Sequence, residues 1–239
     1  MPARLPSLLR PPIGFAHRGA RAHARENTLE AFTLAVRLGA TGLESDVWLT
    51  RDGEPVLDHD GVIRNGLRRR RIGDLDRRQL PEHIPTLAEL YDAVGTGLPL
   101  SLDVKDADAF DATVATARAA GGEAARNLWL CHHKVSQVTA WRPLAPDVRL
   151  VDSTSVGRIR EGVEQRAAAL ADAGIDALNL HHSEWTGGLT ALVHRFGVHC
   201  FGWDAQQPRT LDELLDLGID AVYSDHTDRI VDALARLEA

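Results

Sequence analysis

Residues 15–32 read FAHRGARAHARENTLEAF, and this stretch contains the change from strand to helix on which the fold depends. The apolar run IGFAH at 13–17 is typical of a buried strand, and TLEAFTLAVRLGA at 28–40 has the apolar spacing of an amphipathic helix. The loop between them begins HRGARA and lacks the G-x-G-x-x-G spacing that often follows the first strand of a doubly wound open sheet. A parallel barrel and an open sheet both remain possible, and the missing motif favours the barrel.

The same alternation of strand and helix recurs along the chain. With the extended segment EPVLDHD at 54–60 left outside the main series, the 239 residues contain eight strand–helix units. A (β/α)8 barrel typically has about 250 residues, so we predict a TIM barrel of class α/β that forms a single catalytic domain over 1–239. Residues 61–85 are rich in Arg and Asp and poor in apolar residues, and we interpret them as a short insertion after the second strand region. The predicted strands lie at 13–17, 42–50, 98–105, 127–133, 148–153, 175–182, 198–205 and 220–225, and the predicted helices at 28–40, 86–95, 107–122, 135–144, 157–174, 187–197, 210–218 and 227–239.

Composition excludes several classes of protein. The net charge of −7 and the pI near 5.9 argue against a nucleic-acid binder, which usually has a basic face. The two cysteines, Cys131 and Cys200, lie in apolar strand-like runs and form neither a disulfide framework nor a zinc motif, so we expect buried free thiols. No signal-peptide pattern is found at the N-terminus, and no run approaches the roughly 18 apolar residues of a membrane span. We therefore expect a soluble, cytoplasmic protein without stable membrane insertion.

Polar side chains end several predicted strands, which is where a barrel carries its active site. Glu44 and Asp46 are two residues apart and lie on one face of a strand, and Asp103 lies in the next barrel strand. Three carboxylates that converge on one mouth repel one another unless a cation joins them. Ligands made of oxygen alone favour Mg²⁺ or Ca²⁺ over zinc. The alternative is that each carboxylate pairs separately with an arginine.

Two histidines and two cations accompany these carboxylates. His17 ends the first strand and His59 follows the extended segment, so they form a candidate general acid–base pair, although a single histidine is more often structural. Arg18 has a planar fork that can hold two phosphate oxygens. Lys105 is two residues beyond Asp103 and either binds phosphate or is a structural lysine whose ammonium reaches solvent. We also expect His181, at the end of the sixth strand, to line the pocket.

Taken together, these motifs resemble those of the glycerophosphodiester phosphodiesterase family. The family pattern combines H-R-G, E-N-T with A-F in the following helix, G-A with E-x-D-V, T-x-D-G, H-D and a later E-x-K strand. The corresponding segments are HRGA at 17–20, ENTLEAF at 26–32, GATGLESDVWLTRDGEPVLDHD at 39–60, IPTLAEL at 84–90 and LSLDVK at 100–105. FGWDA at 201–205 and LGIDAVYSD at 217–225 are similar to the family's last two strands, so the resemblance spans nearly the whole chain.

The resemblance implies a TIM barrel that hydrolyses glycerophosphodiesters to an alcohol and sn-glycerol 3-phosphate with the help of one divalent metal ion, Mg²⁺ or Ca²⁺. It implies a catalytic pair, two phosphate-site cations, metal ligands and an aromatic side chain near the glycerol moiety. By position in this sequence these are His17 and His59, then Arg18 and Lys105, then Glu44, Asp46 and Asp103, and finally Trp203.

Asp103 stands where the family usually has Glu. The side chain is one methylene shorter, which draws its oxygens back by roughly 1–1.5 Å, so we expect it to bind the metal directly or through one water. Arg25 replaces the usual Pro before E-N-T, and WDAQ and SDH replace W-T-x-N and T-D-x-P near the end of the chain. These last departures concern contacts with the substrate.

Two other functions remain open at this point. One is a related phospholipase D-like enzyme that acts on lysophospholipids, which a long apolar lip around the mouth would favour and the polar 61–85 segment disfavours. The other is a catalytically inactive barrel used for binding, although neither the histidines nor the E-x-D pair is lost. The sequence assigns no preferred alcohol, no oligomeric state and no role to His132, His133 and His182.

Overall fold

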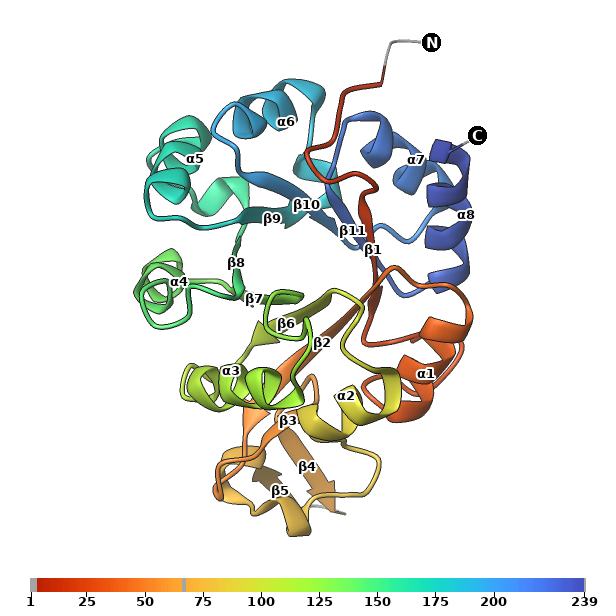
Figure 1. The fold of residues 1–239 in the computed structure, drawn as a ribbon, viewed down its shortest axis with the longest axis vertical. Coiled ribbons are helices and arrows are strands. Elements are labelled where there is room, and N and C mark those ends of the chain that lie inside the picture. The colour runs from red at the N-terminus through yellow and green to blue at the C-terminus, as the bar shows by residue number, and fades with distance from the viewer. Residues whose placement is uncertain (1–3, 66–67, 239) are drawn as a thin grey trace.

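The computed structural model describes residues 4–65 and 68–238, and the structural statements below concern these residues. Within them the main sheet has nine strands, eight of which are parallel and close into a barrel surrounded by helices (Figure 1). The predicted (β/α)8 TIM barrel is therefore confirmed. Its parallel strands, in chain order, are β1 (Ile13–His17), β2 (Gly42–Leu49), β6 (Leu100–Val104), β7 (Leu128–His132), β8 (Arg149–Ser153), β9 (Ala177–His181), β10 (His199–Trp203) and β11 (Ala221–Ser224).

The barrel closes through β1, which pairs with β11 on one side and with β2 on the other. A short strand, β3 (Pro55–Leu57), is added antiparallel to the end of β2 and accounts for the extended segment predicted outside the main series. The helices that surround the barrel are α1 (Leu29–Arg37), α2 (Leu87–Val94), α3 (Ala109–Ala120), α4 (Val135–Trp141), α5 (Val163–Asp172), α6 (Gly187–His194), α7 (Pro208–Asp216) and α8 (Thr227–Glu238).

Aromatic rings fill the interior of the barrel. Phe15 stacks on Tyr223 with ring centroids 4.8 Å apart, and Trp129 lies 5.0 Å from Phe201. All four side chains are buried, and a larger apolar layer separates the strands from the helices. Tyr223 also lines the cavity described below, so the packed interior forms the floor of that cavity.

The predicted insertion at 61–85 folds beside the end of β2. Strands β4 (Val62–Asn65) and β5 (Arg68–Arg71) form an antiparallel hairpin that projects from the barrel (Figure 1), while residues 66–67 lie outside the described residues. Two short 3₁₀ helices, η1 (Ile72–Asp74) and η2 (Arg77–Gln79), follow the hairpin. Apolar residues of this segment pack with Val56 of β3 into a small separate core; they are Ile72, Leu75, Leu80 and Ile84. Its assignment as an insertion within one domain of residues 1–239 stays a prediction.

One helix begins later than the sequence predicts. The apolar spacing at 157–174 predicted a helix from residue 157, but α5 begins at Val163. Residues 156–158 form a separate 3₁₀ helix, η3 (Val156–Arg158), and Gly162 before α5 has a φ of +88°. A helical residue needs a φ near −63°, so this glycine interrupts the helix. The 3₁₀ helix places Arg158 at the rim of the cavity.

Asp220, just before β11, anchors the N-terminal segment at the opposite end of the barrel from the cavity. One carboxylate oxygen accepts hydrogen bonds from Ser7 Oγ at 2.7 Å and from the backbone N–H of Leu8 and Leu9. The other accepts from the backbone N–H of Cys200 and from His194 Nε2, each at 2.7 Å. Burial raises the pKa of Asp220, but these hydrogen bonds outweigh it and hold the pKa below its usual value.

The other composition-based expectations concern membranes and thiols. In the described part of the chain, no helix has both the length and the apolar character needed to cross a membrane. Cys131 and Cys200 are both buried and free, as predicted.

Candidate active site

A cavity of about 450 Å³ opens at the carboxyl ends of the barrel strands. Parallel strands of a barrel all end at this face, so residues that end separate strands meet there. Most of the residues predicted from the sequence line this cavity: His17, Arg18, Glu44, Asp46, Asp103, Lys105 and Trp203.

His17 is held by a carboxylate at the end of the last strand. Its Nδ1 lies 2.6 Å from Asp225 Oδ1, and its Nε2 lies 3.7 Å from Glu44 Oε2. Burial lowers the pKa of His17, but the negative charge of Glu44 and the hydrogen bond with Asp225 outweigh it and raise the pKa above its usual value. The Asp225 contact fixes the proton on Nδ1 and leaves Nε2 facing the cavity. Such an imidazole is suited to accept a proton.

The three predicted carboxylates lie on neighbouring strands. Asp46 of β2 and Asp103 of β6 are register partners, and Glu44 is two residues before Asp46. Lys105 Nζ lies between the two aspartates, 3.1 Å from Asp46 Oδ1 and in contact with Asp103 Oδ2. Burial lowers the pKa of Lys105, but these two carboxylates outweigh it and raise the pKa above its usual value. The amine therefore stays protonated at neutral pH.

Glu44 is buried beside both negative and positive groups. Burial and the neighbouring Asp46 charge raise its pKa to about 7, against the opposing effects of His17 and Arg18. Its Oε2 accepts a hydrogen bond from the backbone N–H of Arg18 at 2.9 Å. A cation beside Glu44 would favour its ionised form, and the donor set of Glu44, Asp46 and Asp103 consists of carboxylate oxygens alone. Those are the ligands that Mg²⁺ and Ca²⁺ prefer, so the residues fit such an ion.

Other groups of the described residues bring their ligand atoms still closer together. The sets whose ligand atoms all lie within 4.8 Å of one another combine histidine with aspartate or cysteine, and Glu44, Asp46 and Asp103 are not one of them. In the carboxylate group, Lys105 occupies the space between Asp46 and Asp103. The three sets are His23 with His226 and Asp228, His181 with His182 and Asp204, and His194 with Cys200 and Asp220.

The loop after β1 holds Arg18 in an unusual backbone conformation. Arg18 has a φ of +52°, which is rare for a residue with a side chain and is typical of functional sites. Gly19 follows with a φ of +77°, and a Cβ there would lie 2.7 Å from the backbone of Ala31, so glycine is required. The Arg18 guanidinium contacts two carboxylates, with Nη1 3.1 Å from Glu26 and Nε 3.3 Å from Asp46.

His59 lines a second, neighbouring cavity of about 300 Å³. Its Nδ1 lies 2.9 Å from Asp60 Oδ1, and the side chain is 40% exposed. Glu26 and Asn27 also line this second cavity, while their partners Arg18 and Asp46 line the first. The ion pair of Arg18 with Glu26 thus separates the two cavities, and His17 and His59 lie on opposite sides of it.

Trp203 and His181 lie at the far side of the first cavity. Trp203 ends β10 and is 41% exposed. His181 ends β9, and its ring meets that of Trp203 edge-on with centroids 4.7 Å apart. Among the described residues, those that line the cavity include Trp203 but not His181. His181 instead packs against the Trp203 ring, whereas the sequence predicted that it lines the pocket.

Comparison with known proteins decides the family. The model of the glycerophosphoryl diester phosphodiesterase family matches residues 17–229, a span from His17 to the first turn of α8. The chain belongs to this family. It is 24% identical over 238 residues to the Bacillus subtilis protein YhdW, whose name places it among the glycerophosphodiester phosphodiesterases; the match covers 90% of this chain and 95% of YhdW. This phosphodiesterase is therefore an enzyme of the same class.

Solved structures share its fold. The glycerophosphodiester phosphodiesterase of Thermotoga maritima has a TM-score of 0.79 at 23% identity, covering 92% of this chain and 97% of that one. An Oleispira antarctica phosphodiesterase in complex with the product sn-glycerol-3-phosphate has a TM-score of 0.81 at 23% identity, covering 94% of this chain and 97% of that one.

Several residues of the phosphodiesterase site escaped the sequence interpretation. Asp225 directly follows β11, so it carries the same strand-end signal as His17, but the sequence analysis includes it only within the segment LGIDAVYSD at 217–225. Arg21 Nη1 lies 3.3 Å from Asp225 Oδ2, and Arg21 also contacts Glu26. Asn27 accepts a hydrogen bond from Ser45 Oγ at 2.8 Å and lies 3.5 Å from Asp46. These residues lie in a loop, where no periodic pattern marks which side chains face the cavity.

Proposed function

We propose that the phosphodiesterase hydrolyses glycerophosphodiesters to an alcohol and sn-glycerol 3-phosphate with one divalent metal ion and histidine acid–base catalysis. The observation that supports this most is the close grouping of an oriented imidazole, two cations and three carboxylates in one cavity. A phosphodiester needs each of these elements at one point: charge neutralisation on its oxygens and proton transfer to and from them.

Glu44, Asp46 and Asp103 would hold the metal ion. When bound, Mg²⁺ or Ca²⁺ would polarise the phosphate and neutralise charge that develops on its oxygens. Asp103 is in contact with Lys105 and is a third exposed on its side chain, whereas the side chains of Glu44 and Asp46 are at most 9% exposed. We therefore assign Glu44 and Asp46 as direct ligands and Asp103 as a ligand that binds directly or through one water.

Arg18 and Lys105 are assigned to the phosphate. Both side chains border the cavity beside the carboxylates and carry positive charge at neutral pH. Arg18 offers two parallel N–H donors, whereas Lys105 offers a compact charge. Glu26 holds the Arg18 guanidinium from the side of the second cavity and so limits its movement.

The two histidines are assigned to proton transfer. His17 accepts a proton from the attacking oxygen at Nε2, because Asp225 holds the proton on Nδ1. His59 donates a proton to the leaving alcohol, and this requires its exposed side chain to turn from Asp60 toward the first cavity when substrate binds. Trp203 packs against the glycerol moiety, and His181 keeps the Trp203 ring in place.

The test is hydrolysis of glycerophosphocholine, followed by enzymatic detection of released sn-glycerol 3-phosphate. We expect turnover that EDTA abolishes and that added Mg²⁺ or Ca²⁺ restores. His17→Ala and His59→Ala should each lower kcat by about 10²–10⁴ while metal binding persists. His83→Ala, which lines the same cavity as His59, is the matched control. Full turnover in a metal-free sample, or near wild-type kcat in either variant of the catalytic pair, would refute the proposal.

One observation favours a second candidate, a phospholipase D-like enzyme that acts on lysophospholipids. Two large apolar side chains are exposed at the mouth: Trp203, and Val156 between the cavity residues Ser155 and Arg158. They provide a small apolar lip that an acyl chain could contact. Lysophosphatidylcholine assayed beside glycerophosphocholine distinguishes the two, because a preference for the lipid by kcat/KM would support the second candidate.

A further inference from the structure

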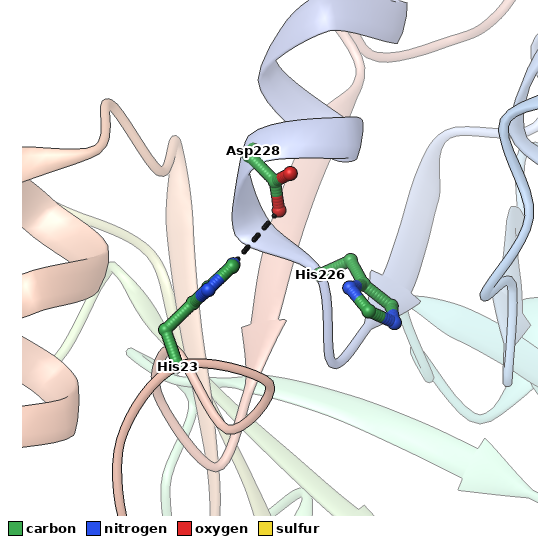
Figure 2. A group of neighbouring side chains, drawn as sticks. All are labelled: His23, His226 and Asp228. Carbon is green, nitrogen blue, oxygen red and sulfur yellow. Dashed lines mark hydrogen bonds and ion pairs between the residues drawn. The ribbon is translucent and has the colours of Figure 1, made fainter.

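Two histidines and an aspartate gather at the rim of the barrel, outside the cavity. His23 comes from the loop between β1 and α1, His226 directly precedes α8, and Asp228 lies in the first turn of α8 (Figure 2). Each offers a ligand atom, and these atoms all lie within 4.8 Å of one another. The two segments are about 200 residues apart in the chain, so the fold rather than local sequence brings these side chains together.

The side chains of this cluster are at least partly exposed and make few hydrogen bonds with other residues. His23 Nε2 lies 3.0 Å from Asp228 Oδ1, a separation that two ligands on one ion also show. Within the described residues, the His226 imidazole makes no hydrogen bond through its side chain, and Figure 2 shows its ring beside the pair. The two imidazoles are nearly perpendicular, with centroids 6.3 Å apart. His23 and Asp228 are exposed and His226 is half-buried; a bound ion would need one nitrogen of each imidazole at about 2.0–2.1 Å.

The other two clusters are less suited to an ion. In the set of His194, Cys200 and Asp220, hydrogen bonds already occupy both oxygens of Asp220, and burial keeps the pKa of the Cys200 thiol well above its usual value. In the set with Asp204, His181 Nδ1 lies 2.7 Å from Ser183 Oγ, and its ring packs on Trp203. In the first set both Asp220 oxygens are already occupied, and the second set belongs to the wall of the cavity described above, which Asp204 lines.

We propose that His23, His226 and Asp228 form a zinc site distinct from the carboxylate site of the cavity. Imidazole nitrogen suits Zn²⁺ and disfavours Mg²⁺ and Ca²⁺, which require oxygen ligands. Three protein ligands with an exposed fourth position leave room for one water. The ion would tie the loop that carries Arg18 and Arg21 to the start of α8, directly beside Asp225, and so would stiffen this side of the mouth. This proposal is independent of the hydrolysis proposed above.

The experiment is a Zn²⁺ titration of the full chain by isothermal titration calorimetry, after EDTA treatment and dialysis, with millimolar Mg²⁺ present throughout to fill the carboxylate site. We expect one Zn²⁺ per chain. His23→Ala and His226→Ala should each weaken its affinity by about tenfold or more, because even outer-shell partners of a metal are worth 10–100-fold. His182→Ala, in the competing cluster, is the matched control and should leave the affinity unchanged.

Two further readouts do not depend on activity. Zn²⁺ at a hundredfold excess over its Kd should raise the Tm of the wild type by roughly 5–10 °C, and this rise should shrink in His226→Ala. Co²⁺ in place of Zn²⁺ should give a visible absorption band that His226→Ala removes. No Zn²⁺ binding in the presence of Mg²⁺, equal affinity in the wild type and both histidine variants, or loss of binding in His182→Ala alone would each overturn the proposal.

Discussion

Asp225→Asn is the substitution that tests the proposed role of His17 most directly. The carboxylate lies 2.6 Å from His17 Nδ1, and the substitution keeps its shape while removing its charge. Arg21 Nη1 lies 3.4 and 3.3 Å from the two Asp225 oxygens. In the variant, Arg21 should attract the amide oxygen and leave the amide NH₂ facing His17. The imidazole would then accept at Nδ1 and carry its proton on Nε2, where it cannot act as a base.

The size of the effect has a lower and an upper bound. Loss of a hydrogen bond to a charged group removes about 1.5–3 kcal/mol from the developing imidazolium, and each 1.36 kcal/mol is a factor of ten, so kcat should fall by about 10- to 150-fold. If the proton also moves to Nε2, the loss should approach the roughly 10⁴-fold effect of the corresponding substitution in Ser-His-Asp proteases. The contact with Arg21 favours the larger loss.

The assay is the pH dependence of kcat/KM with glycerophosphocholine. Burial lowers the pKa of His17, and Glu44 and Asp225 together raise it above its usual value. Removing the Asp225 charge therefore moves the acidic limb of the profile to lower pH, because a base with a lower pKa stays deprotonated further into acid. Asp147→Asn, in a surface ion pair with Arg118, is the control. A loss below about tenfold, together with an unshifted profile, would refute the assigned role of Asp225.

The remaining predictions concern the metal, the phosphate and the fold. Glu44→Gln should weaken Mg²⁺ or Ca²⁺ binding by about tenfold or more, measured by calorimetry, and unchanged affinity would remove Glu44 from the ligand set. Arg18→Lys keeps the charge but loses the two-pronged donor, so kcat/KM should fall substantially; wild-type kinetics would place Arg18 outside the substrate contacts. Asp220→Ala removes the acceptor that anchors the N-terminal segment, so the free energy of unfolding in urea should fall by about 3–5 kcal/mol. Because the pKa of Asp220 is lowered in the fold, its contribution is present above the unfolded pKa and is lost as pH falls through the lowered pKa. The wild type should therefore lose its advantage over Asp220→Ala in acid, and an equal difference at all pH values would contradict this reasoning.

The sequence predicted the barrel well because strand and helix periodicities are local properties. Each barrel strand is a short apolar run, and some helices begin at a recognisable signal, such as the capping box of Thr86 and Glu89 on α2. The start of α5 was misplaced for a reason that periodicity cannot detect. Gly162 takes a positive φ, and this backbone conformation is set by the surrounding loop rather than by the apolar spacing.

The candidate site was predictable only in part. Residues that end strands meet at one face by the geometry of the barrel, so Glu44, Asp46 and Asp103 could be placed together from sequence. Side-chain direction in loops has no such rule. His59 follows a short antiparallel strand and lines the neighbouring cavity, a position that its place in the H-D motif does not indicate. The contact of His17 with Asp225 joins residues 208 positions apart, and the closure of β1 against β11 creates it.

The register of β2 and β6 bears on why a shorter carboxylate is tolerated at position 103. Asp46 and Asp103 are direct partners across the two strands, so their Cα atoms are separated by the ordinary strand spacing of about 4.8 Å. Lys105 lies two residues beyond Asp103 on the same face and reaches both carboxylates. A longer glutamate at 103 would extend into the space that the Lys105 amine now occupies. The shorter side chain therefore keeps Lys105 between the carboxylates, where the amine neutralises Asp103 and faces the same cavity as Arg18. On this geometry the charge of Lys105 and the length of residue 103 form one arrangement, and a change at either position should alter both the proposed metal ligands and the proposed phosphate contacts.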